Sequence, residues 1–216
     1  EGVVLLKINE QKSEGIIVSL NCETDFVAKN KDYLNFASEI LNVAENVNSM
    51  ESLLNSKNGD LSISDKLIEQ TGIIGEKIEI GNFKKLSGKH IGGYVHAGNK
   101  IAAMVALSDS NPFAEEVSKN VAMQVAAMNP LALDENSVDS SIVEKETEII
   151  KEQLVKEGRP ENIIDNIIVG KLKRFYKDNT LTGQSYIKDP KVSVEDYVKS
   201  IDKNLSITSF IRVSLV

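Results

Sequence analysis

The chain has 216 residues, enough to bury a hydrophobic core as one large domain or as two small ones. Its hydrophobic content of 41% is ordinary for a globular protein, and no apolar run approaches the roughly 20 residues of a membrane-spanning helix. The net charge of -7, without a dense Lys/Arg cluster, disfavours a nucleic-acid partner, because phosphate backbones require concentrated positive charge. A protein partner is the stronger expectation, with no direct nucleic acid and no membrane involved.

The single cysteine, Cys22, excludes an internal disulfide framework and favours a reducing compartment, either a bacterial cytoplasm or an organelle matrix. The chain begins without a methionine, and its first residues lead directly into a β-like run over residues 3–8. We therefore expect a fragment or a trimmed chain, with segments missing at both ends.

The first elements in chain order are a β-hairpin and a helix. Residues 2–8 and 15–20 are short β-rich runs around a polar turn. Residues 31–47 then show apolar side chains at three-to-four spacing, which predicts an amphipathic helix. The stripe of this helix comprises Tyr33, Leu34, Ala37, Ile40, Leu41, Ala44 and Val47.

The next segment predicts less regular structure. Residues 49–60 are polar and turn-rich, and residues 62–70 predict a short helix that stops at residues 71–72. Residues 77–83 alternate apolar and charged side chains, as a half-buried strand does.

The chain then repeats its opening pattern. Residues 90–97 and 100–107 predict a second hairpin around a turn at residues 98–99. A helix over residues 112–128 follows, with Asn111 as its N-cap. The expected buried spine of this helix comprises Phe113, Val117, Val121, Val125 and Met128.

The third segment predicts a projecting antiparallel pair of helices. Ser141 and Glu144 have capping-box spacing at the start of the first helix, and a short turn beginning at Gly158 forces the second helix to run back. Residues 194–200 predict a short helix, and residues 210–216 predict a final strand that pairs with a sheet. The apolar positions of the pair are Ile142, Ile149, Ile150, Leu154, Ile163, Ile164, Ile167, Ile168, Leu172, Phe175 and Tyr176.

Two hairpin-then-helix units predict a duplicated α+β fold, with small antiparallel sheets each covered by helices on one face. We expect an amino-terminal core lobe over residues 1–72 and a carboxy-terminal core lobe over residues 73–136, which residues 181–216 complete. Residues 137–180 form the antiparallel helical hairpin.

The chemistry that an enzyme needs is not evident. Cys22 has no histidine near it in the sequence, and the only two histidines are His90 and His96. The glycines of residues 88–93 fit neither a Walker A nor a dinucleotide-binding pattern, so turns are the simpler interpretation. The sequence therefore predicts no enzyme, no catalytic residue, no metal site and no cofactor.

The junction between the first hairpin and the first long helix, NCETDFVAKN over residues 21–30, raises a specific question. From the residues alone, Phe26 could be a hydrophobic staple that closes the helix, and Thr24 or Asp25 could be a helix cap. An exposed Phe26 would instead be a residue kept for a partner.

The stretch LNCETDFVAK, residues 20–29, closely resembles a motif of the bacterial and organellar translation elongation factor Ts family, the guanine-nucleotide exchange factors for elongation factor Tu. Further stretches agree in order: IGE at 74–76, GYVHAG at 93–98, VAMQVAA at 121–127 and LTGQ at 181–184. The resemblance spans nearly the whole chain, which corresponds to the family's core and its helical hairpin. The family's amino-terminal three-helix module and its carboxy-terminal helix have no counterpart, and Ser19 stands where the family commonly carries a glutamate.

The resemblance implies elongation factor Tu as partner and a set of contact residues. In the family, the Asp-Phe pair reaches into the GTPase domain, and the phenylalanine wedges near the magnesium of the nucleotide. From the residues alone, His96 could be a satisfied hairpin histidine and Ile74 could be a core residue, whereas both match family positions that contact the partner. The partner-binding residues that the resemblance implies are Thr24, Asp25, Phe26, Val27, Ile74 and His96.

The function expected from the resemblance is guanine-nucleotide exchange during protein-synthesis elongation, by disturbance of the Mg²⁺ and phosphate site of elongation factor Tu. The competing hypothesis is a non-catalytic adaptor that uses residues 141–177 as a coiled-coil interface. The hairpin supports dimerisation in some family members, so a homodimer or a 2:2 complex stays open. Replacing Phe26 by Ala separates the hypotheses, because only exchange depends on that ring.

Overall fold

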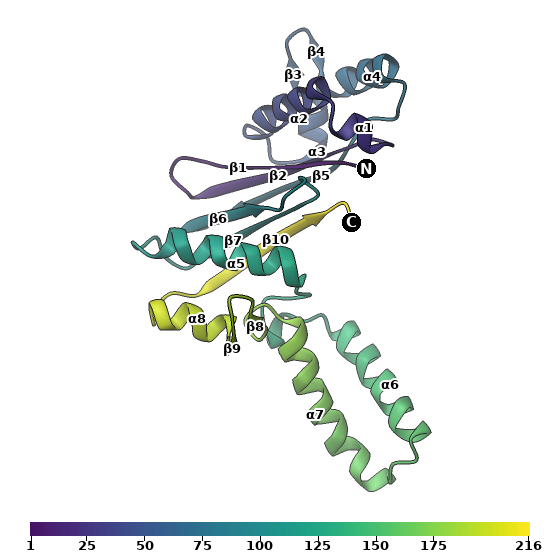
Figure 1. Cartoon of the computed structure of the whole chain (residues 1–216), viewed down its shortest axis with the longest axis vertical. Coiled ribbons are helices and arrows are strands. Elements are labelled where there is room, and N and C mark those ends of the chain that lie inside the picture. Colours follow the sequence, from purple (N-terminus) through teal and green to yellow (C-terminus); the bar gives the residue numbers. More distant parts are fainter. The chain divides into compact units, whose positions relative to one another are not determined.

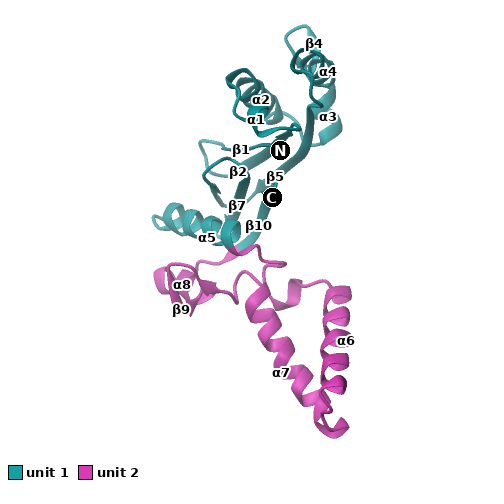
Figure 2. Cartoon of the chain, turned by 45° about the vertical axis from the view of Figure 1, so that its right-hand side comes forward, with its two compact units in different colours: residues 1–127, 208–216 teal, residues 128–207 magenta.

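The computed structural model describes residues 1–216 and divides into two compact units. Unit 1 comprises Glu1–Ala127 and Thr208–Val216, and unit 2 comprises Met128–Ile207 (Figure 2). Helices and small antiparallel sheets make up both units (Figure 1), so the predicted α+β class is confirmed.

The first sheet of unit 1 contains the predicted hairpin. Strands β1 (Gly2–Ile8) and β2 (Glu14–Asn21) pair antiparallel, and β5 (Glu79–Ser87) joins the other edge of β2, in the order β1-β2-β5. The strand predicted over residues 77–83 is therefore present, although it begins and ends later in the chain.

Strand β2 is buried on both faces, which explains its apolar run over residues 16–18 and at residue 20. Ile16 and Leu20 lie in one hydrophobic cluster with Tyr33 of the following helix. Ile17, on the opposite face, packs in a different cluster with Ile91 of the second sheet. A strand that is covered on both sides shows an apolar run rather than alternation.

Four helices follow the first hairpin: α1 (Asp25–Ala28), α2 (Lys31–Ala44), α3 (Met50–Asn55) and α4 (Ile63–Ile74). The predicted amphipathic helix is α2, although it ends at Ala44 rather than at residue 47. Most of the predicted stripe is buried, but the stripe missed Phe36, which is buried, and included Leu34, which is only partly buried. The hydroxyl of Tyr33 donates a hydrogen bond to the carbonyl oxygen of Leu20 at 2.5 Å, which ties the helix to β2.

The segment over residues 49–60 contains more structure than its polar composition predicted. Ser49 caps α3 by accepting a hydrogen bond from the N–H of Ser52, and the strands β3 (Lys57–Asn58) and β4 (Leu61–Ser62) form a small hairpin. Helix α4 also continues beyond its predicted stop to a left-handed cap at Gly75, where φ is 77° and glycine is favoured.

The second sheet of unit 1 has the order β10-β7-β6. Strands β6 (His90–Val95) and β7 (Ile101–Leu107) form the predicted second hairpin, and β10 (Ile207–Ser214) is the predicted final strand, which pairs with β7. The two sheets share the hydrophobic cluster that contains Val4 and Met104, so their inner faces pack against each other.

Helix α5 (Ala114–Met128) packs closely on β6. A Cβ atom at Gly92 would lie 1.9 Å from the hydroxyl oxygen of Ser118, so only glycine permits this approach. The buried spine of α5 was predicted correctly at its valines and wrongly at its ends. Phe113 directly precedes the helix and Met128 is its last residue, and both are about half exposed.

Unit 2 contains the predicted antiparallel pair, formed by α6 (Ser140–Lys156) and α7 (Glu161–Asn179) (Figure 1). The capping box predicted at Ser141 is wrong: Asp139 is the N-cap and accepts a hydrogen bond from the backbone N–H of Ser141 at 2.8 Å. The core of the pair comprises Ile150, Leu154, Ile164 and Ile168, whereas Ile142, Ile149 and Ile163 are partly exposed.

The remainder of unit 2 is a small mixed module. It comprises the 3-10 turn η1 (Glu135–Ser137), the two-stranded sheet of β8 (Ser185–Tyr186) and β9 (Asp189–Ser193), and helix α8 (Val194–Ile201). The predicted short helix over residues 194–200 is α8. Ser193 and Asp196 form its capping box.

The three-part division at residues 72 and 136 remains a prediction about folding units. The observed pairing of β5 with β2 is relevant to it, because β5 lies beyond residue 72 and yet completes the sheet of the first hairpin.

Candidate functional site

Helix α1 is a single turn that interrupts the passage from β2 to α2. Thr24 is its N-cap, with its hydroxyl oxygen 3.4 Å from the N–H of Val27. Asn30 caps α2 immediately afterwards and accepts hydrogen bonds from the N–H groups of Asp32 and Tyr33. Two caps within seven residues therefore hold the turn between two fixed ends.

Phe26 lies on this turn and is 82% exposed. The inward side of α1 is supplied by Ala28, which is buried, and by Val27, which packs partly against the first hydrophobic cluster. The staple interpretation of Phe26 is therefore wrong, because the ring does not pack against α2. A phenylalanine exposed to this degree is a strong candidate for contact with another molecule.

Asp25 and Lys29 form an exposed ion pair across the turn, with 2.7 Å between the carboxylate oxygen and the ammonium nitrogen. The hydrogen bond and the positive charge of Lys29 hold the pKa of the Asp25 carboxyl below its usual value. The carboxylate is thus held by Lys29 in the residue next to Phe26.

The end of α4 presents two isoleucines differently. Ile74, the residue that the resemblance implies, is half-buried and packs against the first hydrophobic cluster. Ile73, which was not singled out from the sequence, is 70% exposed. The adjacent exposed residue was not distinguishable from sequence, because helical spacing does not show which of two neighbours faces the core at a helix end.

The two histidines have different environments. His96 is exposed at the end of the second hairpin, where its Nδ1 lies 3.1 Å from the Tyr94 hydroxyl. His90 is buried, with Nε2 3.5 Å from a carboxylate oxygen of Glu115, and burial lowers its pKa. His96 is therefore the histidine that another molecule can reach.

Backbone pairing brings these segments to one end of unit 1. Asn21, the last residue of β2, is in register with Gly2 and with Glu79, so the segments that follow β2 and precede β5 are neighbours. The N–H of Val4 donates to the carbonyl oxygen of Asn99 at 2.7 Å, which joins the turn after His96 to the same end. Residues separated by about 70 positions in the sequence thus share one surface.

The exposed groups of this surface are the ring of Phe26, the side chain of Ile73, the carboxylate of Asp25 and the imidazole of His96. The thiol of Cys22 is buried and donates a hydrogen bond to the carbonyl oxygen of Thr24, and burial raises its pKa. No group of three or more potential metal ligands lies together in the structure. The arrangement suits protein docking.

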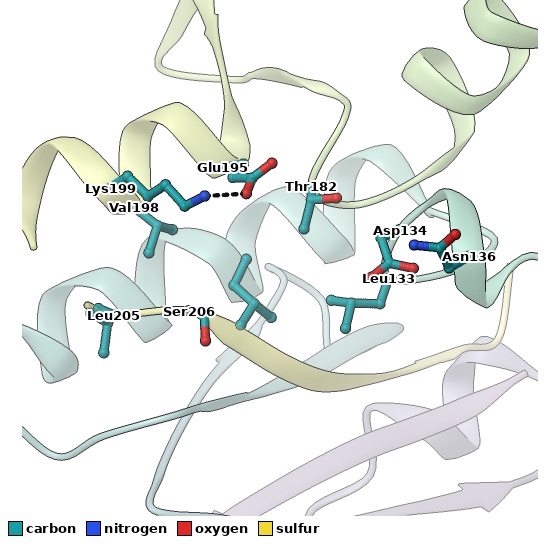
Figure 3. A pocket seen from close by; sticks show the side chains of 10 residues that line it. Leu133, Asp134, Asn136, Thr182, Glu195, Val198, Lys199, Leu205 and Ser206 are labelled. Atoms are coloured by element: carbon teal, nitrogen blue, oxygen red, sulfur yellow. Dashed lines mark hydrogen bonds and ion pairs between the residues drawn. The ribbon is translucent and has the colours of Figure 1, made fainter. Parts of the chain in front are cut away.

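Unit 2 contains a separate pocket of about 360 Å³ (Figure 3). Its charged lining residues are engaged within the unit: Lys199 pairs with Glu195, and Asp134 accepts hydrogen bonds from Ser137. The exposed surface of unit 1 is therefore the candidate site. No helix in the structure is both long and apolar enough to cross a membrane.

Comparison with known proteins shows the family of the chain. A family model described as Elongation factor TS matches residues 23–216. The chain belongs to the elongation factor Ts family. It is 53% identical to an elongation factor Ts of Christiangramia forsetii and 51% identical to one of Flavobacterium psychrophilum, each over 215 residues that cover 100% of this chain and 78% of the relative. It is 38% identical to an elongation factor Ts of Azobacteroides pseudotrichonymphae over 217 residues. The family model includes the segment with Phe26, and the comparisons give no support to the adaptor hypothesis.

Proposed function

We propose that the chain is the guanine-nucleotide exchange factor for elongation factor Tu and that it promotes GDP release during protein-synthesis elongation. Membership of the elongation factor Ts family supports this function. The observation that carries the mechanism is the exposure of Phe26, at 82%, on a turn that is capped at both ends.

Exchange of this kind needs no bond chemistry in the chain. Mg²⁺ requires near-ideal octahedral coordination, so a small displacement of the loops around it weakens nucleotide binding. A partner that binds the nucleotide-free state more tightly must weaken nucleotide binding by the same factor. The chain thus acts through binding energy and is not an enzyme in the usual sense.

The residues of the surface have different roles in this function. Phe26 inserts its ring into the GTPase domain near the magnesium, and Asp25 supplies a charged contact beside it. Thr24 and Val27 hold the turn in shape by the capping hydrogen bond and by packing. His96, and Ile74 with its exposed neighbour Ile73, anchor the complex.

The setting follows from the family. The relatives named above are bacterial, so we place the chain in a bacterial cytoplasm rather than in an organelle matrix. The net charge of -7 fits a protein partner without direct nucleic-acid contact. A homodimer or a 2:2 complex remains a separate hypothesis that sedimentation of the mixture would decide.

The test measures release of a fluorescent GDP analogue from elongation factor Tu in the presence of Mg²⁺. The chain should accelerate release, and Phe26→Ala should reduce the acceleration by at least about tenfold, as loss of a central aromatic contact does. Phe113→Ala is the matched control, because Phe113 is also an exposed phenylalanine of unit 1 but lies at the start of α5. Equal loss in both variants, or no acceleration by the unchanged chain, would contradict the proposal.

A further inference from the structure

We infer that Glu76 is a positioning residue for the exchange surface: its carboxylate clamps residues 23–24 and thereby sets the direction in which the ring of Phe26 leaves the protein. The inference rests on the proposed function, because that function gives Phe26 its task. Glu76 belongs to the IGE stretch at residues 74–76, from which the family resemblance implied only Ile74 as a contact.

The clamp consists of three hydrogen bonds to one carboxylate. One oxygen of Glu76 accepts from the N–H groups of Glu23, at 3.1 Å, and Thr24, at 3.0 Å. The other oxygen accepts from the Thr24 hydroxyl at 2.5 Å. Hydrogen bonds to an ionised acceptor are the strong class, and the bond from the Thr24 hydroxyl is the main reason that the pKa of the Glu76 carboxyl lies below its usual value.

The clamp also orients the cap of α1. A threonine hydroxyl carries one proton, so donation to Glu76 leaves the lone pairs of the oxygen for the N–H of Val27. The carbonyl oxygen of Thr24 accepts from the N–H of Ala28 and from the thiol of Cys22. Every polar group of Thr24 is thus engaged, so the N-cap residue two positions before Phe26 is held in one orientation.

A single helical turn does not hold its own direction, because helix nucleation is unfavourable without outside support. The support comes from residues 75–78, which are themselves anchored. Thr71 accepts hydrogen bonds from the N–H groups of Gly75 and Ile78, and Ile78 is buried. The clamp therefore joins the single turn of α1 to the anchored segment over residues 75–78.

A reciprocal bond completes the connection. One carboxylate oxygen of Glu23 accepts from the N–H of Lys77 at 3.1 Å. Each of the two segments, residues 23–24 and residues 76–77, thus has a carboxylate that accepts hydrogen bonds from backbone N–H groups of the other. The exposed end of α4 with Ile73 and the turn with Phe26 are held as one body, which is the preorganisation that tight docking requires.

A purely structural role for Glu76 predicts different results from a positioning role. Loss of a structural contact would lower the stability of the whole unit and would act independently of Phe26. Loss of the clamp would free residues 23–28 locally and would act through Phe26. The variants that separate these cases are Glu76→Ala, Glu76→Gln and the control Glu79→Ala. Glu79 is a nearby exposed carboxylate whose side chain pairs with Lys77.

The first measurement is amide hydrogen exchange by NMR in the free chain, which is independent of any partner. Glu76→Ala should speed exchange at the N–H groups of Glu23 and Thr24 by about tenfold or more, while the amides of α2 keep their protection. Glu76→Gln should stay within about threefold of the unchanged chain, because its amide can accept at the oxygen and donate to Thr24. Unchanged exchange at residues 23–24 in Glu76→Ala, or faster exchange throughout α2, would overturn the clamp.

The second measurement is GDP release from elongation factor Tu. Compared with the unchanged chain, Glu76→Ala should lower the stimulated rate of GDP release by about tenfold. Glu76→Gln should retain most of that rate, and Glu79→Ala should leave it unchanged. A Phe26→Leu variant should keep a measurable rate, because leucine retains part of the apolar contact. In that background Glu76→Ala should reduce the rate much less than it does alone, because coupled residues are not additive. Full additivity would overturn the positioning role. If the unchanged chain does not accelerate release, the proposed function fails together with any role of the clamp in exchange, whereas the amide measurement still decides whether the clamp exists.

Discussion

Replacing Phe26 by Ala should leave the stability of the fold almost unchanged, although the removal of a phenylalanine ring is usually severe. Phe26 is 82% exposed, so only about a fifth of the residue is covered in the folded chain. Full burial of a phenylalanine contributes about 1.5–3 kcal/mol, and a fifth of that is about 0.3–0.6 kcal/mol. Alanine regains up to about 0.5 kcal/mol from its higher helix propensity. The expected change in unfolding free energy is therefore within about 0.5 kcal/mol of zero.

Phe36 provides the contrast within the same part of the chain. It lies on α2, is 6% exposed and packs in the first hydrophobic cluster. Phe36→Ala loses the transfer free energy of the ring and leaves a cavity, so it should cost about 3–5 kcal/mol. The two substitutions are chemically identical, and only the burial of the side chain distinguishes them.

Urea denaturation followed by circular dichroism measures both values. The slope of the transition should be the same in the three proteins, so a shift in midpoint reports stability. A loss of more than about 1 kcal/mol in Phe26→Ala would refute the reasoning, because the ring would then pack within this chain and would not be available to a partner. An equally small effect in Phe36→Ala would show that the cluster does not stabilise unit 1 as described.

Three further predictions follow from particular contacts. Lys29→Ala should raise the pKa of the Asp25 carboxyl toward its ordinary value, measured by carboxyl-carbon NMR, and an unmoved pKa would mean that the pair does not form in solution. Burial depresses the pKa of His90 in the folded chain, so its neutral form stabilises the fold at pH values above the unfolded pKa of about 6.5. This stabilisation should be lost as pH falls through the folded pKa. In urea titrations, His90→Gln should therefore lose less unfolding free energy between pH 7 and 5 than the unchanged chain does. Gly92→Ala should lower Tm by at least about 2–4 °C, since its Cβ would lie 1.9 Å from the Ser118 hydroxyl oxygen, and an unchanged Tm would show that α5 can move away without cost.

Local features of the sequence predicted the elements well where short-range physics decides them. Both hairpins, α2, the two long helices of unit 2 and α8 were predicted, because periodic apolar positions and turn residues act within a few residues. The errors were local too. The capping box was predicted at Ser141, whereas the N-cap is Asp139, only two residues earlier. Helix α3, within residues 49–60, was missed because it is too short to give a periodic signal.

The sequence by itself determined that a motif with an aspartate and a phenylalanine stands between the first hairpin and the first long helix, and it determined the family. Only the tertiary structure decided how the motif is used. Whether Phe26 is exposed and whether Ile73 or Ile74 faces outward depend on which faces the neighbouring elements cover. The clamp of Glu76 on Thr24 joins residues 52 positions apart, through the pairing of β2 with β5, and no local pattern encodes such a contact. Packing between distant segments therefore converts a recognisable motif into an oriented surface.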